Sequence, residues 1–237
     1  RRLGLYWRRT RGRIATQCPL CAGRAAGGQL CAGCESDIRA TTSTLIPRCK
    51  RCALRLPALV LHCQDCMRRL PAFEHTVAAF DYESPADSLI SLFKTELKFA
   101  YADLLAGLLE DAMRHDSMPL ESYDVLMPIP SSRASLRRRG FNPAAEIARA
   151  LAARTGLPLS RDALRRRREG PRQAAGNRRT RLQAAVGLFD CHFAVHGKTV
   201  AIVDDVMTTG STMDAAALAV LDAGAARVTA LVVARTP

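Results

Sequence analysis

The chain has 237 residues, of which 48% are hydrophobic, and this is enough to form a core and excludes a disordered protein. Its formal net charge of +13 favours anionic partners such as nucleotides, pyrophosphate or nucleic acid. No run approaches the ~18 apolar residues of a membrane span, and the basic first residues lack an apolar export segment, so we expect a cytoplasmic protein.

Residues 1–17 are basic with scattered apolar side chains, and we interpret them as a short docking helix in preference to a nucleic-acid-binding arm. Residues 18–70 then carry four Cys-x-x-Cys pairs. Each pair places two thiolates in a tight turn, and two pairs complete a tetrahedral four-sulfur zinc site. Large apolar residues are scarce in this span, so we expect a zinc-ribbon module that is folded by its metal.

The spacing of the cysteines leaves two alternatives open. One or two structural Zn²⁺ ions could bind, and the pairs could combine in sequential or crossed order. In a chain expected to be cytoplasmic, metal is favoured over disulfides. The candidate ligands are Cys18, Cys21, Cys31, Cys34, Cys49, Cys52, Cys63 and Cys66.

Residues 71–237 alternate between apolar β-branched runs and stretches with helical periodicity, which predicts an α/β fold with a parallel sheet flanked by helices. Ligands of such sheets bind at the carboxyl ends of the strands. The expected elements are strands at 75–82, 123–130, 200–203 and 227–234, helices up to about residue 115, at 143–154 and at 213–223, and an arginine-rich mobile loop at 161–186. Lys94 and Lys98 are expected on the side of the first helical stretch that faces away from its leucines.

A motif with site chemistry follows the strand at 200–203. Asp204 and Asp205 are placed where that strand is expected to end, and a turn rich in hydroxyl groups leads from Thr208 to Thr212 and into a helix. Free backbone N–H groups at the start of a helix bind phosphate, and Gly210 lets the backbone approach the anion. Carboxylates beside it suit vicinal hydroxyls or Mg²⁺, so we predict a phosphorylated sugar as the ligand.

This motif resembles the phosphoribosyl pyrophosphate (PRPP) motif of type I phosphoribosyltransferases. The resemblance implies that Asp204 and Asp205 hold the ribose hydroxyls and act in catalysis. It also implies that the loop holds the 5′-phosphate. The PRPP-binding stretch would comprise Asp204, Asp205, Val206, Met207, Thr208, Thr209, Gly210, Ser211 and Thr212.

Together with the paired cysteines, the whole chain is similar to the competence-protein ComF family. This resemblance is carried by the eight cysteines, Leu97–Phe99, Pro128–Pro130, Arg138–Asn142, Arg172–Gln173 and Val203–Thr212. It implies a type I phosphoribosyltransferase-like domain at 71–237 behind the zinc-ribbon region, PRPP with Mg²⁺ as ligands, and a link to DNA uptake and to competence-machinery proteins. The base-recognising hood of ordinary phosphoribosyltransferases is not recognisable, and the zinc region is a candidate for its position.

Three functions remain as hypotheses. In the first, an enzyme transfers phosphoribosyl with release of pyrophosphate, which Arg133 and the catalytic candidate Arg139 would bind through their guanidinium groups. In the second, a non-catalytic competence factor binds single-stranded DNA, because residues 131–190 hold fifteen arginines and four carboxylates. The nucleic-acid-binding candidates are Arg165, Arg166, Arg167 and Arg168. The third, weaker hypothesis is a zinc-ribbon regulator that senses PRPP.

Overall fold

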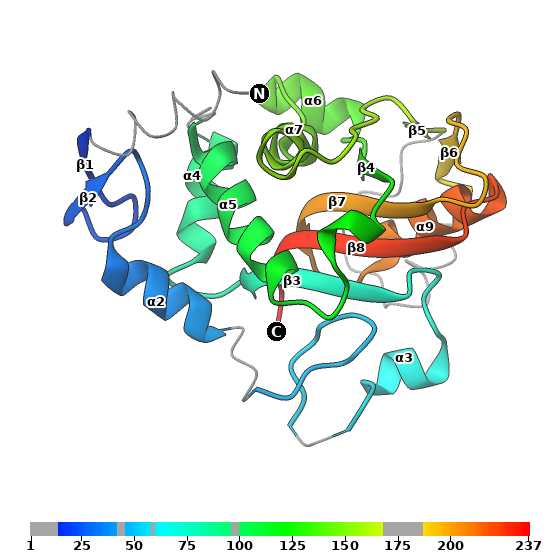
Figure 1. Ribbon diagram of the computed structural model, residues 1–237, viewed down its shortest axis with the longest axis horizontal. Coiled ribbons are helices and arrows are strands. Elements are labelled where there is room, and N and C mark those ends of the chain that lie inside the picture. The colour runs from blue at the N-terminus through cyan, green and yellow to red at the C-terminus, as the bar shows by residue number, and fades with distance from the viewer. Residues whose placement is uncertain (1–13, 42–45, 58–59, 96–99, 168–186) are drawn as a thin grey trace.

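The computed structural model describes residues 14–41, 46–57, 60–95, 100–167 and 187–237. Its centre is a four-stranded parallel sheet in the order β3–β8–β7–β4 (Figure 1). The strands are β3 (His75–Asp81), β8 (Arg227–Arg235), β7 (Thr199–Met207) and β4 (Val125–Pro128). The predicted parallel α/β architecture is confirmed.

Both faces of the sheet are covered, because successive side chains of its central strands point to opposite sides. Ala201 and Val203 of β7 belong to one core cluster, whereas Val200 and Ile202 belong to the other. The first face packs under α4 (Asp87–Thr95), α5 (Ala100–Arg114) and α7 (Pro143–Thr155). The second packs against α9 (Ser211–Asp222), so the predicted leucine stripe is core.

The remaining elements of the carboxyl-terminal part are short. A 3₁₀ turn, η1 (Leu120–Ser122), precedes β4, and α6 (Arg133–Arg139) follows it. β5 (Leu164–Arg166) and β6 (Phe189–Cys191) form a separate antiparallel pair. The prediction of a loop over 161–186 is therefore wrong at 164–166, where the backbone N–H and C=O groups form strand hydrogen bonds with β6. Residues 168–186, which include Arg168, lie outside the described residues, as do Lys98 and residues 1–13.

The expected strand at 200–203 is longer than its apolar run. β7 continues to Met207, so Asp204 and Asp205 lie within the strand and not beyond its end. The reason is its neighbour, since β8 pairs with β7 as far as Met207 opposite Arg235. Backbone hydrogen bonding to an adjacent strand carries the extended conformation past the point where the hydrophobic pattern stops.

The cysteine-rich region divides into two halves that pack against different sides of the sheet. The first half contains the β1 (Ala15–Gln17) and β2 (Arg24–Ala26) pair and α2 (Ala32–Thr41), and it buries Leu30 and Ile38 in the cluster under α5. The second half contains α3 (Gln64–Arg68) and joins the cluster that includes α9. The domain boundary at residue 70 stays a prediction. Within the ranges that the structure describes, each helix is too short or too polar to span a bilayer.

Candidate functional site

Asp204 and Asp205 lie at the carboxyl-terminal end of β7, and both are partly buried. Asp204 Oδ1 accepts a hydrogen bond from the backbone N–H of Asp205 at 2.9 Å, and Asp205 Oδ1 accepts one from Val206 at 2.8 Å. The second oxygen of Asp205 is 2.7 Å from Lys94 Nζ, which reaches it from the end of α4. Lys94 is thus a site residue that sequence reasoning placed only on the outer face of a helix.

The electrostatics of this pair are unbalanced. Burial, followed by the neighbouring charge of Asp205, holds the pKa of Asp204 well above its usual range, and Lys94 opposes that shift only in part. Two carboxylates share one lysine here, so a further cation or a hydrogen-bond donor would stabilise the ionised form of Asp204. Vicinal hydroxyls and a hard divalent cation are the two partners that suit such oxygens.

The loop after β7 leads into the start of α9 through a left-handed glycine. Gly210 has φ +75°, a conformation that residues with a Cβ rarely adopt, and it is the N-cap of α9. Because this N-cap has no side chain, it offers no acceptor of its own to the first-turn N–H groups of α9, and the N–H of Ser211 donates instead to Thr209 Oγ1 at 3.5 Å. Thr209 Oγ1 lies 3.0 Å from Ser211 Oγ, so hydroxyl groups gather at the same helix start. The helix begins at Ser211, two residues before its predicted start.

The turn after β4 lies beside the end of β7, because these two strands are neighbours in the sheet. Asn142 fixes this turn: its Nδ2 donates to the carbonyl oxygen of Ile129 at 2.9 Å, and its Oδ1 accepts from Ser131 at 2.9 Å. Phe141 is buried edge-on against Phe93, with ring centroids 5.4 Å apart. The Gly-Phe-Asn part of the motif therefore holds the turn in place and does not itself present a charge.

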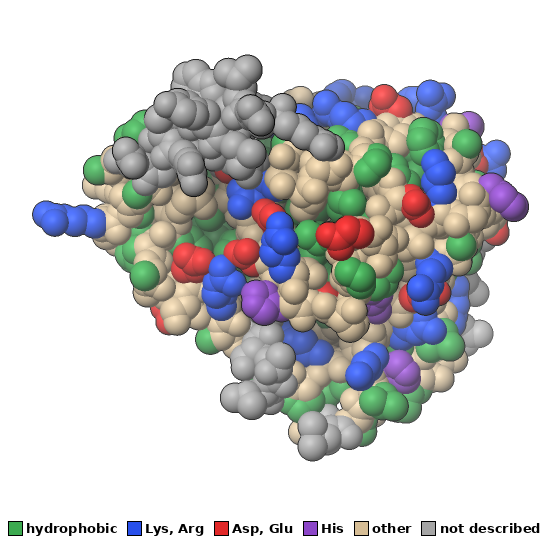
Figure 2. All heavy atoms as spheres, in the orientation of Figure 1, with side chains coloured by type: hydrophobic (Ala, Val, Ile, Leu, Met, Phe, Trp, Pro, Cys, Tyr) green, Lys and Arg blue, Asp and Glu red, His purple; other side chains and the backbone are tan. Residues whose placement is uncertain are grey.

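The pyrophosphate candidates sit at the two ends of α6. Ser132 caps this helix by accepting from the N–H of Ser135, so Arg133 is the first helical residue. The prediction from the sequence that Arg133 belongs to the turn before the helix is therefore wrong. Arg139 is the last, and its Nε is buried with no hydrogen-bond partner among the described residues. Figure 2 shows Lys and Arg side chains at the top of the view, over α6.

The arginines proposed for nucleic acid differ in their surroundings. Arg165 is exposed. Arg166 donates to the carbonyl oxygen of Pro130 at 3.4 Å and stacks over Phe189, with its guanidinium carbon 5.0 Å from the ring centroid. Arg167 pairs with Asp190 at 2.5 Å. Arg166 thus holds β5 and β6 against the turn after β4, whereas Arg167 links the residue after β5 to β6.

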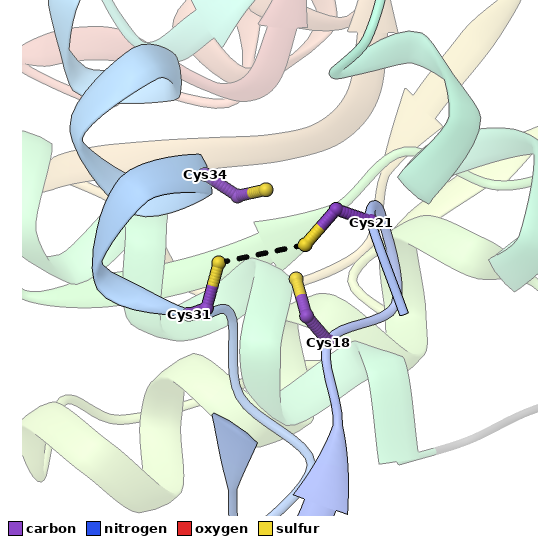
Figure 3. A group of neighbouring side chains, drawn as sticks. All are labelled: Cys18, Cys21, Cys31 and Cys34. Atoms are coloured by element: carbon purple, nitrogen blue, oxygen red, sulfur yellow. Dashed lines mark hydrogen bonds between the residues drawn. The ribbon is translucent and has the colours of Figure 1, made fainter. Parts of the chain in front are cut away.

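The first group of cysteines has the geometry of a zinc site. Figure 3 shows the side chains of Cys18, Cys21, Cys31 and Cys34 directed toward a common point. Their sulfur atoms all lie within 4.8 Å of one another, and those of Cys21 and Cys31 are 3.6 Å apart. Sulfurs bound at about 2.3 Å around a tetrahedral ion would be about 3.8 Å apart, so the group fits Zn²⁺.

The second group consists of Cys49, Cys52, Cys63 and Cys66, all buried and within the same mutual distance. The pairs therefore combine in sequential order, which settles the alternative that spacing left open, and two groups suited to zinc are present. A hydrogen bond from Cys66, with help from Arg235, lowers the pKa of Cys52, whereas the pKa of Cys66 is raised. Four neighbouring thiols cannot all ionise without a cation, and Zn²⁺ supplies that charge.

The second cysteine group is tied to the carboxyl edge of the sheet by polar contacts. Asp81, at the end of β3, is fully buried, accepts hydrogen bonds from Arg48 at 2.9 and 2.8 Å, and forms an ion pair with Arg55, whose Nε lies 2.5 Å from Asp81 Oδ2. Arg235, at the end of β8, donates to the carbonyl oxygen of Cys52 at 2.7 Å, and its Nη2 lies 3.9 Å from the sulfur of Cys52. No local sequence signal identified Arg235, because its partners are distant along the chain.

Comparison with known proteins agrees with this arrangement. A phosphoribosyl transferase domain model matches residues 134–237. Competence protein F of Haemophilus influenzae is 28% identical over 207 residues, which cover 84% of this chain and 87% of that protein. The DNA utilization protein YhgH of Escherichia coli K12 is 30% identical over 225 residues, covering 92% and 96%. The chain belongs to the ComF family of competence proteins.

The family assignment rests on these relatives. Among solved structures, a purine phosphoribosyltransferase from Pyrococcus horikoshii shares 22% identity over 54% of this chain and 68% of that one, with a TM-score of 0.31, and this adds nothing to the assignment. In the ComF-family chain described here, the domain match includes both Arg139 and the whole of Asp204–Thr212.

Proposed function

We propose that this ComF-family protein binds PRPP, with the ribose hydroxyls at Asp204 and Asp205 and the 5′-phosphate at Thr208–Thr212. The observation that carries the proposal is the order of features along β7 and α9. Two carboxylates near the end of β7 are followed, five residues after Asp205, by a left-handed Gly210 that is the N-cap of α9 and has no side chain to cap it. The carboxylates suit hydroxyl groups or Mg²⁺, and the nearby N-terminus of α9 attracts anions. Together they match the two ends of a sugar phosphate.

The carboxylate pair also fits Mg²⁺, because it offers hard oxygen ligands and, with both groups ionised, would carry more negative charge than Lys94 balances. When bound, Mg²⁺ would orient the pyrophosphate and the ribose and offset their charge. Lys94 would then release Asp205 and contact the incoming ligand instead. The two cysteine groups would hold structural zinc, since all four positions of each are filled by sulfur and none is open for chemistry.

In the catalytic form of the proposal, the bond from ribose C1 to the pyrophosphate oxygen breaks and a bond from C1 to an acceptor nitrogen forms. The acceptor loses its proton to solvent and pyrophosphate leaves with the bonding electrons. Positive charge develops on the ribose ring beside Asp204 and Asp205. Negative charge develops on the pyrophosphate, where Arg133 and Arg139 would bind it. Positioning and electrostatic stabilisation therefore supply most of the catalysis.

A second candidate is a DNA-handling protein in which PRPP binding is regulatory. It is favoured by the excess of arginine over carboxylate in residues 131–190 and by the relatives named for competence and DNA utilization. Single-stranded DNA would bind mainly through its phosphates, because aromatic side chains are scarce in this segment. Competence-machinery proteins would be further partners. PRPP binding and DNA handling are both functions that suit a cytoplasmic protein.

One experiment separates the candidates. The full chain is incubated with PRPP and Mg²⁺, with free bases, with single-stranded DNA or with no acceptor, and pyrophosphate release is measured beside PRPP binding. Release that depends on an acceptor supports the enzyme. Binding of PRPP and DNA without release supports the regulated DNA-binding protein. Absence of PRPP binding would refute both forms of the proposal.

A further inference from the structure

A cleft of about 570 Å³ lies next to the loop that we assign to the phosphate. One part of its lining comes from Thr209, Gly210 and Asp214, at the start of α9. The other part comes from the second cysteine group and the segment after it, including Cys66, Arg68 and Arg69. Asp204 and Asp205 are not among the lining residues, so the cleft lies on the phosphate side of the site and not on the ribose side.

The two parts of this lining are joined by specific contacts. Asp214 accepts a hydrogen bond from the backbone N–H of Ala72 at 2.7 Å and pairs with Arg69 at 3.2 Å. Phe73 is buried, and its ring lies 3.7 Å from the point that a Cβ on Gly210 would occupy. The segment after the second cysteine group is therefore docked on the start of α9, and the two segments together line the cleft.

Arg68 lines the cleft and has a guanidinium group that is available to bind a ligand there. Around the cleft, Arg69 is paired with Asp214, Arg51 donates to the carbonyl oxygen of Phe73 at 3.2 Å, and Arg235 is bonded to Cys52. Arg68 is exposed and has neither an ion pair nor a hydrogen bond from its side chain to any described residue. It is also the last residue of α3, whose N-cap is Cys63 and which contains Cys66. The cysteine group thus fixes the helix that carries it.

We propose that Arg68 binds the phosphate group held at Thr208–Thr212, so that the second cysteine group forms one wall of the sugar-phosphate site. The inference rests on the proposed function and adds to it a residue from outside the matched domain. The backbone N–H groups of α9 face the phosphate from one side, and a guanidinium on the cleft side supplies a formal charge that the loop itself lacks. The loop offers hydroxyl and amide donors but no cation.

The test compares ligand binding by the full chain and by two matched variants, with titration calorimetry. Arg68→Gln removes the proposed contact. Arg24→Gln makes the same charge change at an exposed arginine of β2, in the other cysteine half. The ligands are PRPP, ribose 5-phosphate, inorganic phosphate and ribose. We expect Arg68→Gln to raise the dissociation constant of ribose 5-phosphate about tenfold, the scale of one charge-assisted hydrogen bond, with Arg68→Lys recovering part of the loss.

The outcomes separate the inference from the proposed function. Equal affinity of Arg68→Gln and the unaltered chain for ribose 5-phosphate and PRPP would overturn the role of Arg68 while leaving the proposed function in place. Equal losses in Arg68→Gln and Arg24→Gln would also overturn it, because the effect would then be one of net charge. Binding of inorganic phosphate as tight as that of ribose 5-phosphate would overturn the assignment to a sugar phosphate. No binding of PRPP or ribose 5-phosphate by the unaltered chain would overturn the proposed function and this inference with it.

Discussion

Replacing both carboxylates of β7, as Asp204→Asn with Asp205→Asn, should weaken PRPP binding strongly while preserving the fold. Each Asp uses one oxygen to accept a backbone N–H, from Asp205 and Val206, and an Asn side chain can accept the same bonds. The local backbone of β7 is therefore maintained. What the variant loses is the negative charge directed at the ribose hydroxyls and Mg²⁺.

The size of the effect follows from the contacts. One charge-assisted hydrogen bond contributes about 1.5–3 kcal/mol. The two contributions do not add fully, because ionising Asp204 beside Asp205 already carries a cost and because in the unaltered chain the ligand must displace Lys94 from Asp205. We therefore expect a loss of about 2–4 kcal/mol, a dissociation constant raised about 30-fold to 700-fold.

The assay is titration calorimetry with PRPP and Mg²⁺, with circular dichroism to verify the fold of the variant. Lys94→Met is the informative companion. It removes the counter-charge without touching the carboxylates, so it should not weaken the affinity for Mg²⁺, and the loss of the contact between Lys94 and the ligand should weaken PRPP binding far less than the double Asn variant does. Unchanged affinity for PRPP in a folded double Asn variant would refute the assignment of these carboxylates.

Three further predictions concern stability, pH and metal, and a fourth concerns DNA. Asp81→Asn should lower the free energy of unfolding by about 3–5 kcal/mol because it leaves two arginines without their buried carboxylate, whereas Glu83→Gln, which alters an exposed partner of Arg55, should cost less than about 1 kcal/mol. Equal losses in urea titrations would contradict this. The raised pKa of Asp204 means that the folded state holds its proton more tightly than the unfolded state. Asp204 therefore contributes stability below the ordinary carboxyl pKa, and this contribution is lost as pH rises through the raised pKa. Between these two pKa values the unaltered chain should lose stability relative to Asp204→Asn. A chelator should release zinc and unfold the region at 18–70, and protein purified without added zinc that is folded yet metal-free would contradict this. Replacing Arg165–Arg168 by Ser should flatten the salt dependence of single-stranded DNA binding by roughly 0.7 per lost phosphate contact, and an unchanged slope would count against DNA binding there.

Features whose signals are local could be predicted from the order of the amino acids. Paired cysteines predicted four-sulfur groups, because two thiolates in one turn have few other uses in a chain of this kind. The apolar run at 200–203, the carboxylates after it and the turn around Gly210 predicted a strand, a helix and an anion site between them. These predictions needed only neighbouring residues, and the strand, the helix and the left-handed glycine are all present.

The tertiary structure alone decided what depends on residues far apart in the chain. It decided which cysteine pairs combine, because that depends on how the 18–34 and 49–66 segments fold. It extended β7 to Met207 through pairing with β8, against the end of the hydrophobic pattern. It also brought Lys94 to Asp205 and Arg235 to Cys52, from 111 and 183 positions away. Hydrophobic periodicity and motif spacing report only on nearby residues, whereas a charged side chain finds its partner through the packing of whole elements.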